Sequence, residues 1–511
     1  MLSAPTLPAL LRVAATTAPD AEAFRYRDER LTYRDWDTLA DRLAAAFAAR
    51  GVGHGDVVAL LLPSTPFYLV AYLAAARLGA VTAGINVRYR RTEIAHIVAR
   101  AAPRLLVAID AWHDADFRRA LDGIAVPVEW IPSARLTAST TGTIVAIGPA
   151  AGPMADVATA DDPAAIVFTS GTTGAPKGAC YTHRNLLALA TIEARRHADG
   201  APPFAKHLAA GLSFAHVGTM ARIAVQIANL GSSLINDHFD PATVLATIER
   251  ERLTHLGGIP TQIIMLLDHP DRARRDLSSL QSVLLGGAPS SPALIHRVQD
   301  TLGVVVSVRY SSTEVGIATA SLPDDPPERL ATTVGRPTPG VQLRIADATG
   351  RPVAAGETGC VCVRSPATMV GYWHDDEATQ AVRDGEGFIH TGDLGFVDEG
   401  GYVHLRGRQS EMFIRGGFNV HPSEIEDLLA RHPKVARAAV VGVPDPVFGE
   451  VGWAFVAPRD PANPPTLAEL RAFVGTELAS FKRPDGLTLL AELPVTPMYK
   501  VDKRALAALP R

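Results

Sequence analysis

Along the first hundred positions, segments whose apolar residues follow the pattern of a strand alternate with segments whose apolar residues follow the pattern of a helix. Residues 57–62, 79–83 and 105–109 are short apolar runs, which are typical of buried strands. Two segments with helical patterns accompany these runs. An Ala- and Leu-rich segment that ends near Gly51 precedes the first run, and residues 67–78, which have the length of a helix, lie between the first and the second. Because strands and helices alternate in this order, the pattern predicts a largely parallel sheet covered by helices.

The pattern changes further along the chain. Residues 132–162 are rich in Ala, Gly, Thr, Ser and Pro with little periodicity, which predicts an irregular connection. Alternation resumes from 164 to about 321, and short strands with Gly-rich turns follow over 333–407. The last hundred residues predict a small α+β unit, with helices at 423–431 and 467–479 and strands at 436–443 and 487–490. We therefore expect an α/β protein with a large N-terminal domain of parallel-rich sheets covered by helices, a small β subdomain and a small α+β C-terminal domain.

Composition narrows the class of protein. A length of 511 residues exceeds the rough prior of about 150 residues per domain, so two to four units are expected. A formal net charge of -4 gives no indication of a nucleic-acid partner or of binding to a membrane surface. The N-terminus lacks the basic segment of a secretory signal, and Pro63 and Pro66 interrupt the most apolar region. We expect a cytoplasmic location and no membrane span.

Lysine and cysteine are both scarce. Among 49 basic residues, 43 are arginines and the lysines are Lys177, Lys206, Lys434, Lys482, Lys500 and Lys503. Because the two residue types are not interchangeable at a site, each lysine is a candidate for function, although compositional bias explains the scarcity equally well. Cys360 and Cys362 lie two apart on a predicted strand and so face the same side, and Cys180 is the third cysteine. With no further cysteine as a partner, buried structural thiols are favoured over a metal site.

A string of hydroxyl and glycine residues follows the apolar strand predicted at 165–168. It comprises Thr169, Ser170, Gly171, Thr172, Thr173 and Gly174, with Lys177 three residues further on. Glycines let backbone N–H groups converge on an anion and hydroxyl groups add donors, so the string has the chemistry of a phosphate cradle. Its spacing is not that of a Walker A loop. The alternative, a flexible Ser/Thr/Gly turn, is disfavoured by the length of the whole string, 169–178.

Residues 169–178 resemble the phosphate-loop signature of the adenylate-forming superfamily, which contains acyl-CoA synthetases, aryl-CoA ligases, luciferases and peptide-synthetase adenylation domains. Motifs similar to others of that superfamily follow in the same order along essentially the whole chain. They are Gly286–Gly287–Ala288–Pro289, Tyr310–Ser311–Ser312–Thr313–Glu314, Thr391–Gly392–Asp393, Gly407–Arg408, residues 416–426 and residues 494–500.

The resemblance implies a reaction in two halves. A carboxylate attacks the α-phosphate of ATP to give an acyl-adenylate and pyrophosphate, and a thiol, usually that of coenzyme A, then displaces AMP. The implied cofactors are ATP, Mg²⁺ and coenzyme A. The implied partner is a small carboxylic acid, with a carrier protein as a further candidate acceptor and no nucleic acid.

The same resemblance assigns roles to the motif residues. For the phosphates, Thr169, Ser170, Thr172 and Thr173 would hold the β- and γ-groups in the loop that contains Gly171 and Gly174, with charge from Lys177. For the nucleoside, Gly287, Ala288 and Pro289 would lie beside the adenine, Tyr310, Ser311 and Ser312 would complete the site, and Asp393 and Arg408 would reach the ribose. For the chemistry, Thr313 would donate to the α-phosphate, Glu314 would hold Mg²⁺, and Lys500 would bridge the carboxylate and the α-phosphate. The Gly416–Gly417 loop favours CoA as the acceptor.

His216 occupies the position where the family has an aromatic residue or histidine beside the acyl pocket. A histidine satisfied in the core is the alternative. The pocket is expected around His216, residues 286–288 and residues 308–312, whose small, apolar and hydroxyl side chains fit an aryl acid or a short to medium aliphatic acid. The sequence leaves the choice between these acids open.

Three departures from the family pattern bear on the acceptor and on movement. Ser311 and Tyr499 each replace a usual glycine, and Ser410–Glu411 stands at the hinge, where relatives often carry an acidic residue. The resemblance implies an N-terminal domain at 1–408, a hinge at 409–411, a mobile C-terminal lid at 412–511 and an active site between them. Two further hypotheses remain: an adenylating enzyme that uses another acceptor, such as a carrier-protein thiol or an amine, and a non-catalytic nucleotide-binding homologue.

Overall fold

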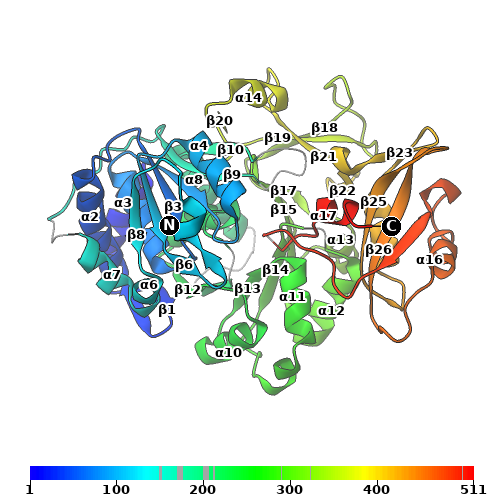
Figure 1. The fold of residues 1–511 in the computed structure, drawn as a ribbon, viewed down its shortest axis with the longest axis horizontal. Coiled ribbons are helices and arrows are strands. Elements are labelled where there is room, and N and C mark those ends of the chain that lie inside the picture. The colour runs from blue at the N-terminus through cyan, green and yellow to red at the C-terminus, as the bar shows by residue number, and fades with distance from the viewer. Residues whose placement is uncertain are drawn as a thin grey trace.

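The computed structural model describes residues 1–148, 152–169, 176–198, 206–210, 213–288, 290–322, 324–497 and 499–510. Figure 1 shows the chain passing from blue and cyan elements on the left, through green elements in the lower centre and yellow ones above, to orange and red elements on the right. A helix with the length and apolarity needed to cross a membrane is absent from these described ranges. We refer to residues 1–408 as the N-terminal body and to residues 412–511 as the C-terminal unit.

Seven strands form the first sheet of the N-terminal body, in the order β20, β10, β9, β4, β3, β5, β8. Pairing is parallel from β9 to β8, whereas β10 is antiparallel to both β9 and β20. The strands are β3 (Val57–Leu61), β4 (Val81–Ile85), β5 (Leu105–Ile109), β8 (Val128–Ile131), β9 (Pro163–Phe168), β10 (Gly178–Thr182) and β20 (Gly371–Tyr372). The strand predicted at 79–83 begins later because Gly79, with a φ of 67°, belongs to the turn before it.

Nine strands form the second sheet, in the order β17, β16, β15, β14, β13, β11, β12, β1, β2. The run from β15 to β1 is parallel and both edges are antiparallel, so the parallel-rich prediction is confirmed. The strands are β1 (Glu22–Tyr26), β2 (Glu29–Thr32), β11 (Lys206–Ala210), β12 (Ser232–Asn236), β13 (His255–Gly258), β14 (Ser282–Gly286), β15 (Val305–Ser312), β16 (Gly316–Ala320) and β17 (Arg336–Pro337).

Helices cover both sheets. They are α1 (Leu7–Thr17), α2 (Tyr33–Ala49), α3 (Pro66–Arg77), α4 (Arg91–Ala101), α5 (Phe117–Leu121), α8 (His183–Ala198), α9 (Val217–Ala228), α10 (Pro241–Glu251), α11 (Pro260–Asp268), α12 (Pro292–Leu302), α13 (Pro327–Thr332) and α14 (Asp376–Val382), with a 3₁₀ turn η1 (Pro270–Arg274). Every residue of α3 is buried, because α1, α2 and α7 (Thr140–Ile147) pack around it. Its last residue, Arg77, pairs with Asp37 and Asp41 of α2, which compensates a fully buried charge.

The prediction of an irregular connection over 132–162 was wrong for its first half. Two short helices, α6 (Ser133–Ala138) and α7 (Thr140–Ile147), lie there. The carboxylate of Glu29, from β2, accepts hydrogen bonds from the backbone N–H groups of Thr140 (2.8 Å) and Thr141 (3.1 Å) at the start of α7. This long-range acceptor adds to the local N-cap of α7, Ser139, whose Oγ accepts from the N–H of Gly142 at 3.0 Å.

A small antiparallel sheet follows, as predicted for 333–407. Its order is β18 (Gln342–Ala346), β19 (Gly359–Arg364), β21 (Ile389–Val397) and β22 (Val403–Arg408). The pairing of β19 with β21 slips between Cys360, opposite Leu394, and Cys362, opposite His390. Residues 391–393 therefore bulge out of the ladder. A separate two-stranded ribbon joins β6 (Ala111–Trp112) and β7 (Ala115–Asp116).

The C-terminal unit begins after a 3₁₀ turn, η2 (Gln409–Glu411), and has its own core around Phe413, Val440 and Leu470. Its elements are β23 (Phe413–Arg415), β24 (Phe418–Val420), α15 (Pro422–Leu429), β25 (Val435–Asp445), β26 (Gly449–Pro458), α16 (Leu467–Val474), η3 (Ser480–Lys482), β27 (Gly486–Leu489) and α17 (Lys503–Ala507). The small α+β prediction is confirmed, although α16 ends at Val474 rather than at 479. The role of 409–411 as a hinge stays a prediction.

Candidate active site

The ends of the glycine-rich segment are held together where β9 and β10 form a hairpin. The backbone N–H of Thr169 donates to the carbonyl of Lys177 at 2.9 Å, and the N–H of Lys177 donates to Thr169 Oγ1 at 3.2 Å. The Lys177 ammonium lies 5.2 Å from the ring centroid of Tyr372 in β20. The other predicted phosphate ligands, Ser170, Gly171, Thr172, Thr173 and Gly174, lie outside the described residues.

Glu314 is held by two hydroxyl donors just beyond β15. Ser312 Oγ donates to Glu314 Oε2 at 3.0 Å, and the Tyr372 hydroxyl donates to Oε1 at 3.0 Å. The Tyr181 hydroxyl donates to the carbonyl of Thr313. Tyr372 therefore contacts both Lys177 and Glu314, and it joins two motifs that are far apart in the sequence.

Asp393 is a buried carboxylate with a donor on each oxygen. Tyr310 donates its hydroxyl to Oδ2 at 2.5 Å, and Arg408 Nε donates to Oδ1 at 2.8 Å. Arg408 is opposite Asp393 because β21 and β22 pair at these residues. Burial, and then the charge of Asp393, raises the pKa of Tyr310 well above its usual value. Tyr310 thus remains a protonated donor across the physiological range.

Gly287 and Ala288 follow β14, next to the β15 residues that lead to Tyr310. Gly286 pairs with Arg309, so the ends of these parallel strands meet at one edge of the sheet. Gly287 has a φ of 80°, and an added Cβ would lie 3.3 Å from Ile259 Cγ2, so a larger residue would be strained there. Ser311 lies on β15 opposite Ile317 of β16. Pro289, the fourth residue of this motif, lies outside the described residues.

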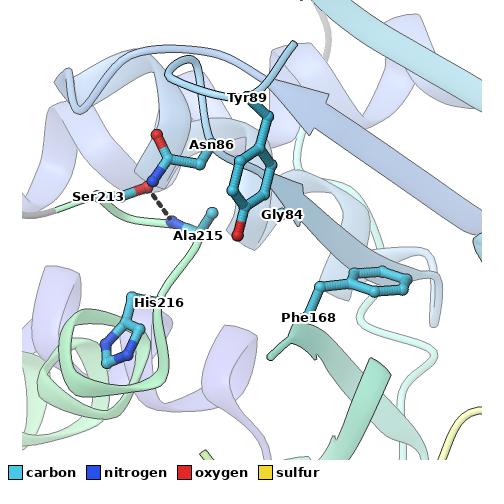
Figure 2. A pocket seen from close by; sticks show the side chains of 7 residues that line it. All are labelled: Gly84, Asn86, Tyr89, Phe168, Ser213, Ala215 and His216. Atoms are coloured by element: carbon cyan, nitrogen blue, oxygen red, sulfur yellow. Dashed lines mark hydrogen bonds between the residues drawn. The ribbon is translucent and has the colours of Figure 1, made fainter. Parts of the chain in front are cut away.

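His216 caps the N-terminus of α9 and lines a small pocket, shown in Figure 2. Its Nδ1 accepts from the N–H of Gly218 at 3.2 Å. Burial, and then the charge of Lys500, lowers the pKa of His216 to about 4, so the ring is neutral at pH 7. The cavity volume is about 10 Å³, and the lining residues are Gly84, Asn86, Tyr89, Phe168, Ser213, Ala215 and His216.

Sequence reasoning expected the pocket around His216, 286–288 and 308–312. His216 does line it, with Ser213 and Ala215 close by in sequence, but Gly84, Asn86 and Tyr89 were missed. At Gly84 in β4, an added Cβ would lie 2.6 Å from the Tyr68 hydroxyl and 2.7 Å from Ala215.

Lys500 brings the C-terminal unit to the N-terminal body. A short turn holds its backbone: the N–H of Thr496 donates to its carbonyl at 2.7 Å, and its own N–H donates to Thr496 Oγ1 at 3.3 Å. Burial, and then the charge of Arg408, lowers the pKa of the Lys500 ammonium. The carboxylates of Asp393, Glu314 and Glu411 act in the opposite direction. Lys500 therefore shares one electrostatic environment with His216 and with the residues around Glu314 and Asp393.

Tyr499 has a left-handed backbone with a φ of 58°. Its ring packs against Phe239 with centroids 6.2 Å apart, and its carbonyl accepts from Thr261 Oγ1 at 3.3 Å. The left-handed conformation, which favours glycine, is thus occupied by a bulky residue with contacts on the N-terminal body.

Gly416 and Gly417 are not brought to this cluster. They form the turn between β23 and β24, with φ values of 55° and 85°. The N–H of Gly416 donates to the carbonyl of Phe448 at 2.8 Å, within the C-terminal unit. In Figure 1, β23 lies at the upper right, away from β14 and β15.

Two family models match the chain. The model described as AMP-binding enzyme covers residues 11–373, and the model described as AMP-binding enzyme C-terminal domain covers residues 424–500.

Individual relatives match over nearly the full length. A 3-[(3aS,4S,7aS)-7a-methyl-1,5-dioxo-octahydro-1H-inden-4-yl]propanoyl:CoA ligase of Mycobacterium tuberculosis is 37% identical, with 99% of each chain covered. The structure of ATP-bound MatB from Rhodopseudomonas palustris superposes with a TM-score of 0.88 at 30% identity, covering 98% of both chains. The amide bond synthetase McbA from Marinactinospora thermotolerans superposes with a TM-score of 0.86 at 32% identity, covering 98% of this chain and 99% of that chain.

Proposed function

The chain belongs to the AMP-binding enzyme family, and on that basis we propose that it is an acid–thiol ligase. The carboxylate oxygen of an acid attacks the α-phosphorus of ATP and displaces pyrophosphate, which leaves an acyl-adenylate. The sulfur of coenzyme A then attacks the acyl carbon, and AMP leaves with the electron pair of the broken carbon–oxygen bond.

The observation that carries this proposal is the position of Lys500. Its ammonium comes from the C-terminal unit but interacts electrostatically with His216, Asp393 and Glu314 of the N-terminal body. An ammonium on a flexible stem can neutralise charge that shifts from the attacking carboxylate to the α-phosphate. We propose this role for Lys500, with Thr313 as a further donor to the α-phosphate.

The nucleotide has a matching set of groups. We propose that Asp393 accepts from the ribose hydroxyls, since a buried carboxylate fixed by Tyr310 and Arg408 is a preorganised acceptor. Residues 169–178, with Lys177, would bind the β- and γ-phosphates, and Gly287 and Ala288 would flank the adenine. The slip at 391–393 supports this role because it removes Asp393 from the pairing with β19, while Asp393 stays paired with Arg408 of β22.

The Glu314 carboxylate is a suitable oxygen ligand for Mg²⁺. A half-buried carboxylate, oriented by Ser312 and Tyr372, is the hard oxygen ligand that this ion prefers. When bound, the ion would neutralise charge on the phosphate oxygens.

The acid would bind beside His216. Tyr89 and Phe168 supply ring surfaces there, and the absence of a side chain at Gly84 lets Ala215 pack close to β4. Because the His216 ring is neutral, the charge of the acid would be met by Lys500 rather than by the histidine. We propose an aryl acid or a short to medium aliphatic acid as the substrate class.

The acceptor has a second candidate. The similarity to an amide bond synthetase, together with Ser311 and Tyr499 in place of the usual glycines, favours an amine or a carrier-protein thiol as the alternative to coenzyme A. The reaction belongs in a reducing compartment such as the cytoplasm, which is supported by three free thiols.

One assay tests the function and separates the acceptors. The enzyme is incubated with ATP, Mg²⁺ and a panel of acids, and pyrophosphate and AMP are measured with and without coenzyme A. CoA-dependent AMP release is expected. Release that is indifferent to coenzyme A would favour the other acceptors, and no turnover with any acid would overturn the proposal.

A further inference from the structure

Two thiols and an imidazole meet where β19 pairs with β21. Cys360 and Cys362 lie on β19 and His390 lies on β21, opposite Cys362. The two sulfur atoms and a ring nitrogen all lie within 4.8 Å of one another. The sequence shows two cysteines with no third partner nearby, because the third ligand comes from the neighbouring strand.

The geometry of this cluster is close to that of a bound metal. With Zn–S distances of about 2.3 Å and a Zn–N distance of about 2.0 Å, tetrahedral ligand atoms lie roughly 3.5–3.8 Å apart. The cluster therefore needs a contraction of at most about 1.3 Å. Cys362 is fully buried, whereas Cys360 and His390 are half-exposed, so one side is open for entry of an ion and for a water ligand.

The surroundings also suit a metal site. The Asp384 carboxylate lies 3.3 Å from His390 Nε2, an arrangement that orients the imidazole and leaves Nδ1 for a metal. Arg344 of β18 pairs with Asp384 and fixes it in turn.

We propose that Cys360, Cys362 and His390 bind one soft divalent cation, of which Zn²⁺ is the natural candidate, with water as the fourth ligand. The ion would tie β19 to β21 beside the bulge at 391–393. It would thereby brace the strand that carries Asp393, whose contact with the nucleotide rests on the proposed function.

Cobalt spectroscopy tests the site without reference to catalysis. The full-length protein, stripped with chelator and kept reduced, is titrated with Co²⁺. We expect one equivalent to give a thiolate-to-cobalt charge-transfer band and the intense visible bands of tetrahedral cobalt, and Zn²⁺ to abolish both. No such bands with the wild-type protein would overturn the proposal, whether or not the enzyme activates any acid.

Matched variants locate the bands. Cys360→Ser and His390→Gln should each weaken binding by at least about 100-fold, because even loss of an outer partner costs roughly 10–100-fold. Asp384→Asn should fall within that smaller range. Cys180→Ser removes the third cysteine of the chain, which lies on β10 in another sheet, and should leave the bands unchanged.

Thermal unfolding gives an independent measure. Zn²⁺ should raise the Tm of the wild-type protein and of Cys180→Ser, but not that of the Cys360→Ser/Cys362→Ser double variant. Charge-transfer bands that persist in the double variant, or that disappear in Cys180→Ser, would overturn the proposal. Far-UV circular dichroism establishes that each variant is folded before titration.

Discussion

The guanidinium of Arg88 lies over the ring of Tyr499, 4.1 Å from its centroid. Arg88 also donates through Nη1 to the carbonyl of Pro497 at 3.1 Å. Arg88 of the N-terminal body thus contacts both a side chain and a backbone carbonyl of the segment that carries Lys500. A left-handed backbone costs a non-glycine residue about 1–2 kcal/mol, and the ring contacts offset that cost.

Loss of the Tyr499 ring should therefore weaken the adenylation half-reaction. We expect Tyr499→Ala to lower the rate of acid-dependent ATP–pyrophosphate exchange by roughly 2- to 30-fold, the range of one cation–π contact. Tyr499→Phe keeps the ring and should be close to wild type. An exchange rate that is unchanged in Tyr499→Ala would show that Arg88 does not hold this segment through the ring.

Lys500 should be needed for one half-reaction only. We expect Lys500→Ala to lower adenylation by at least about 10²-fold, as for loss of a preorganised charge-stabilising donor, and to spare capture of a preformed adenylate by coenzyme A. The control is Lys434→Ala, since Lys434 pairs with Glu469 within the C-terminal unit. Equal loss of both half-reactions would refute the assigned role.

The lowered pKa of Lys500 gives a pH dependence. The side chain acts in its protonated form, and burial and the charge of Arg408 lower its pKa from the usual 10.5. The rate of adenylation should therefore fall with rising pH, and the fall should begin at a lower pH than the titration of an ordinary lysine. Lys500→Arg keeps a charge that is not lost at any accessible pH, so its residual activity should lack this alkaline limb. The measurement is the rate of ATP–pyrophosphate exchange as a function of pH for the wild type and for Lys500→Arg. If both proteins lose activity at the same alkaline pH, the loss belongs to a group other than Lys500.

A buried histidine away from the site should govern acid stability. His183 accepts from the N–H of Leu7 at Nδ1 (3.3 Å), and burial lowers its pKa to about 4. The unfolded chain takes up this proton near pH 6.5, so stability present above pH 6.5 is lost as pH falls toward 4, by up to about 3 kcal/mol. In urea unfolding at stepped pH, His183→Asn, which retains an acceptor, should show a smaller loss. Parallel curves for the two proteins would contradict the assignment.

The parts of the fold that could be predicted are those that local sequence determines. The strand before Thr169 is one of them, because it pairs in a short hairpin with β10, its neighbour in sequence; the bulge around Gly392, between the distant strands β19 and β21, was not predicted. The helix α7 was missed from the sequence although Ser139 is a local N-cap, and the second acceptor at its start, Glu29, comes from a distant strand that local patterns do not reveal. Thr172 and its neighbours in the predicted phosphate segment stay untested.

Contacts between distant segments explain the other gaps at the site. Tyr372 joins Lys177 to Glu314, and it carries no motif of its own. Gly84 lines the pocket only because β4 lies beside the segment that carries Ala215. Such contacts depend on the packing of whole sheets, which hydrophobic periodicity does not specify.

The uneven distribution of lysines has a practical consequence for labelling chemistry. Four of the six follow residue 430, and Lys434, Lys482 and Lys503 there form ion pairs with glutamates. The C-terminal unit consequently offers many more lysine amines per residue to amine-reactive reagents than the rest of the chain does. Because the chain has so few lysines, a cross-link from Lys177 to any of these four amines can be assigned by mass spectrometry almost without ambiguity. Such cross-links measure how the C-terminal unit is placed on the N-terminal body without introducing engineered probes.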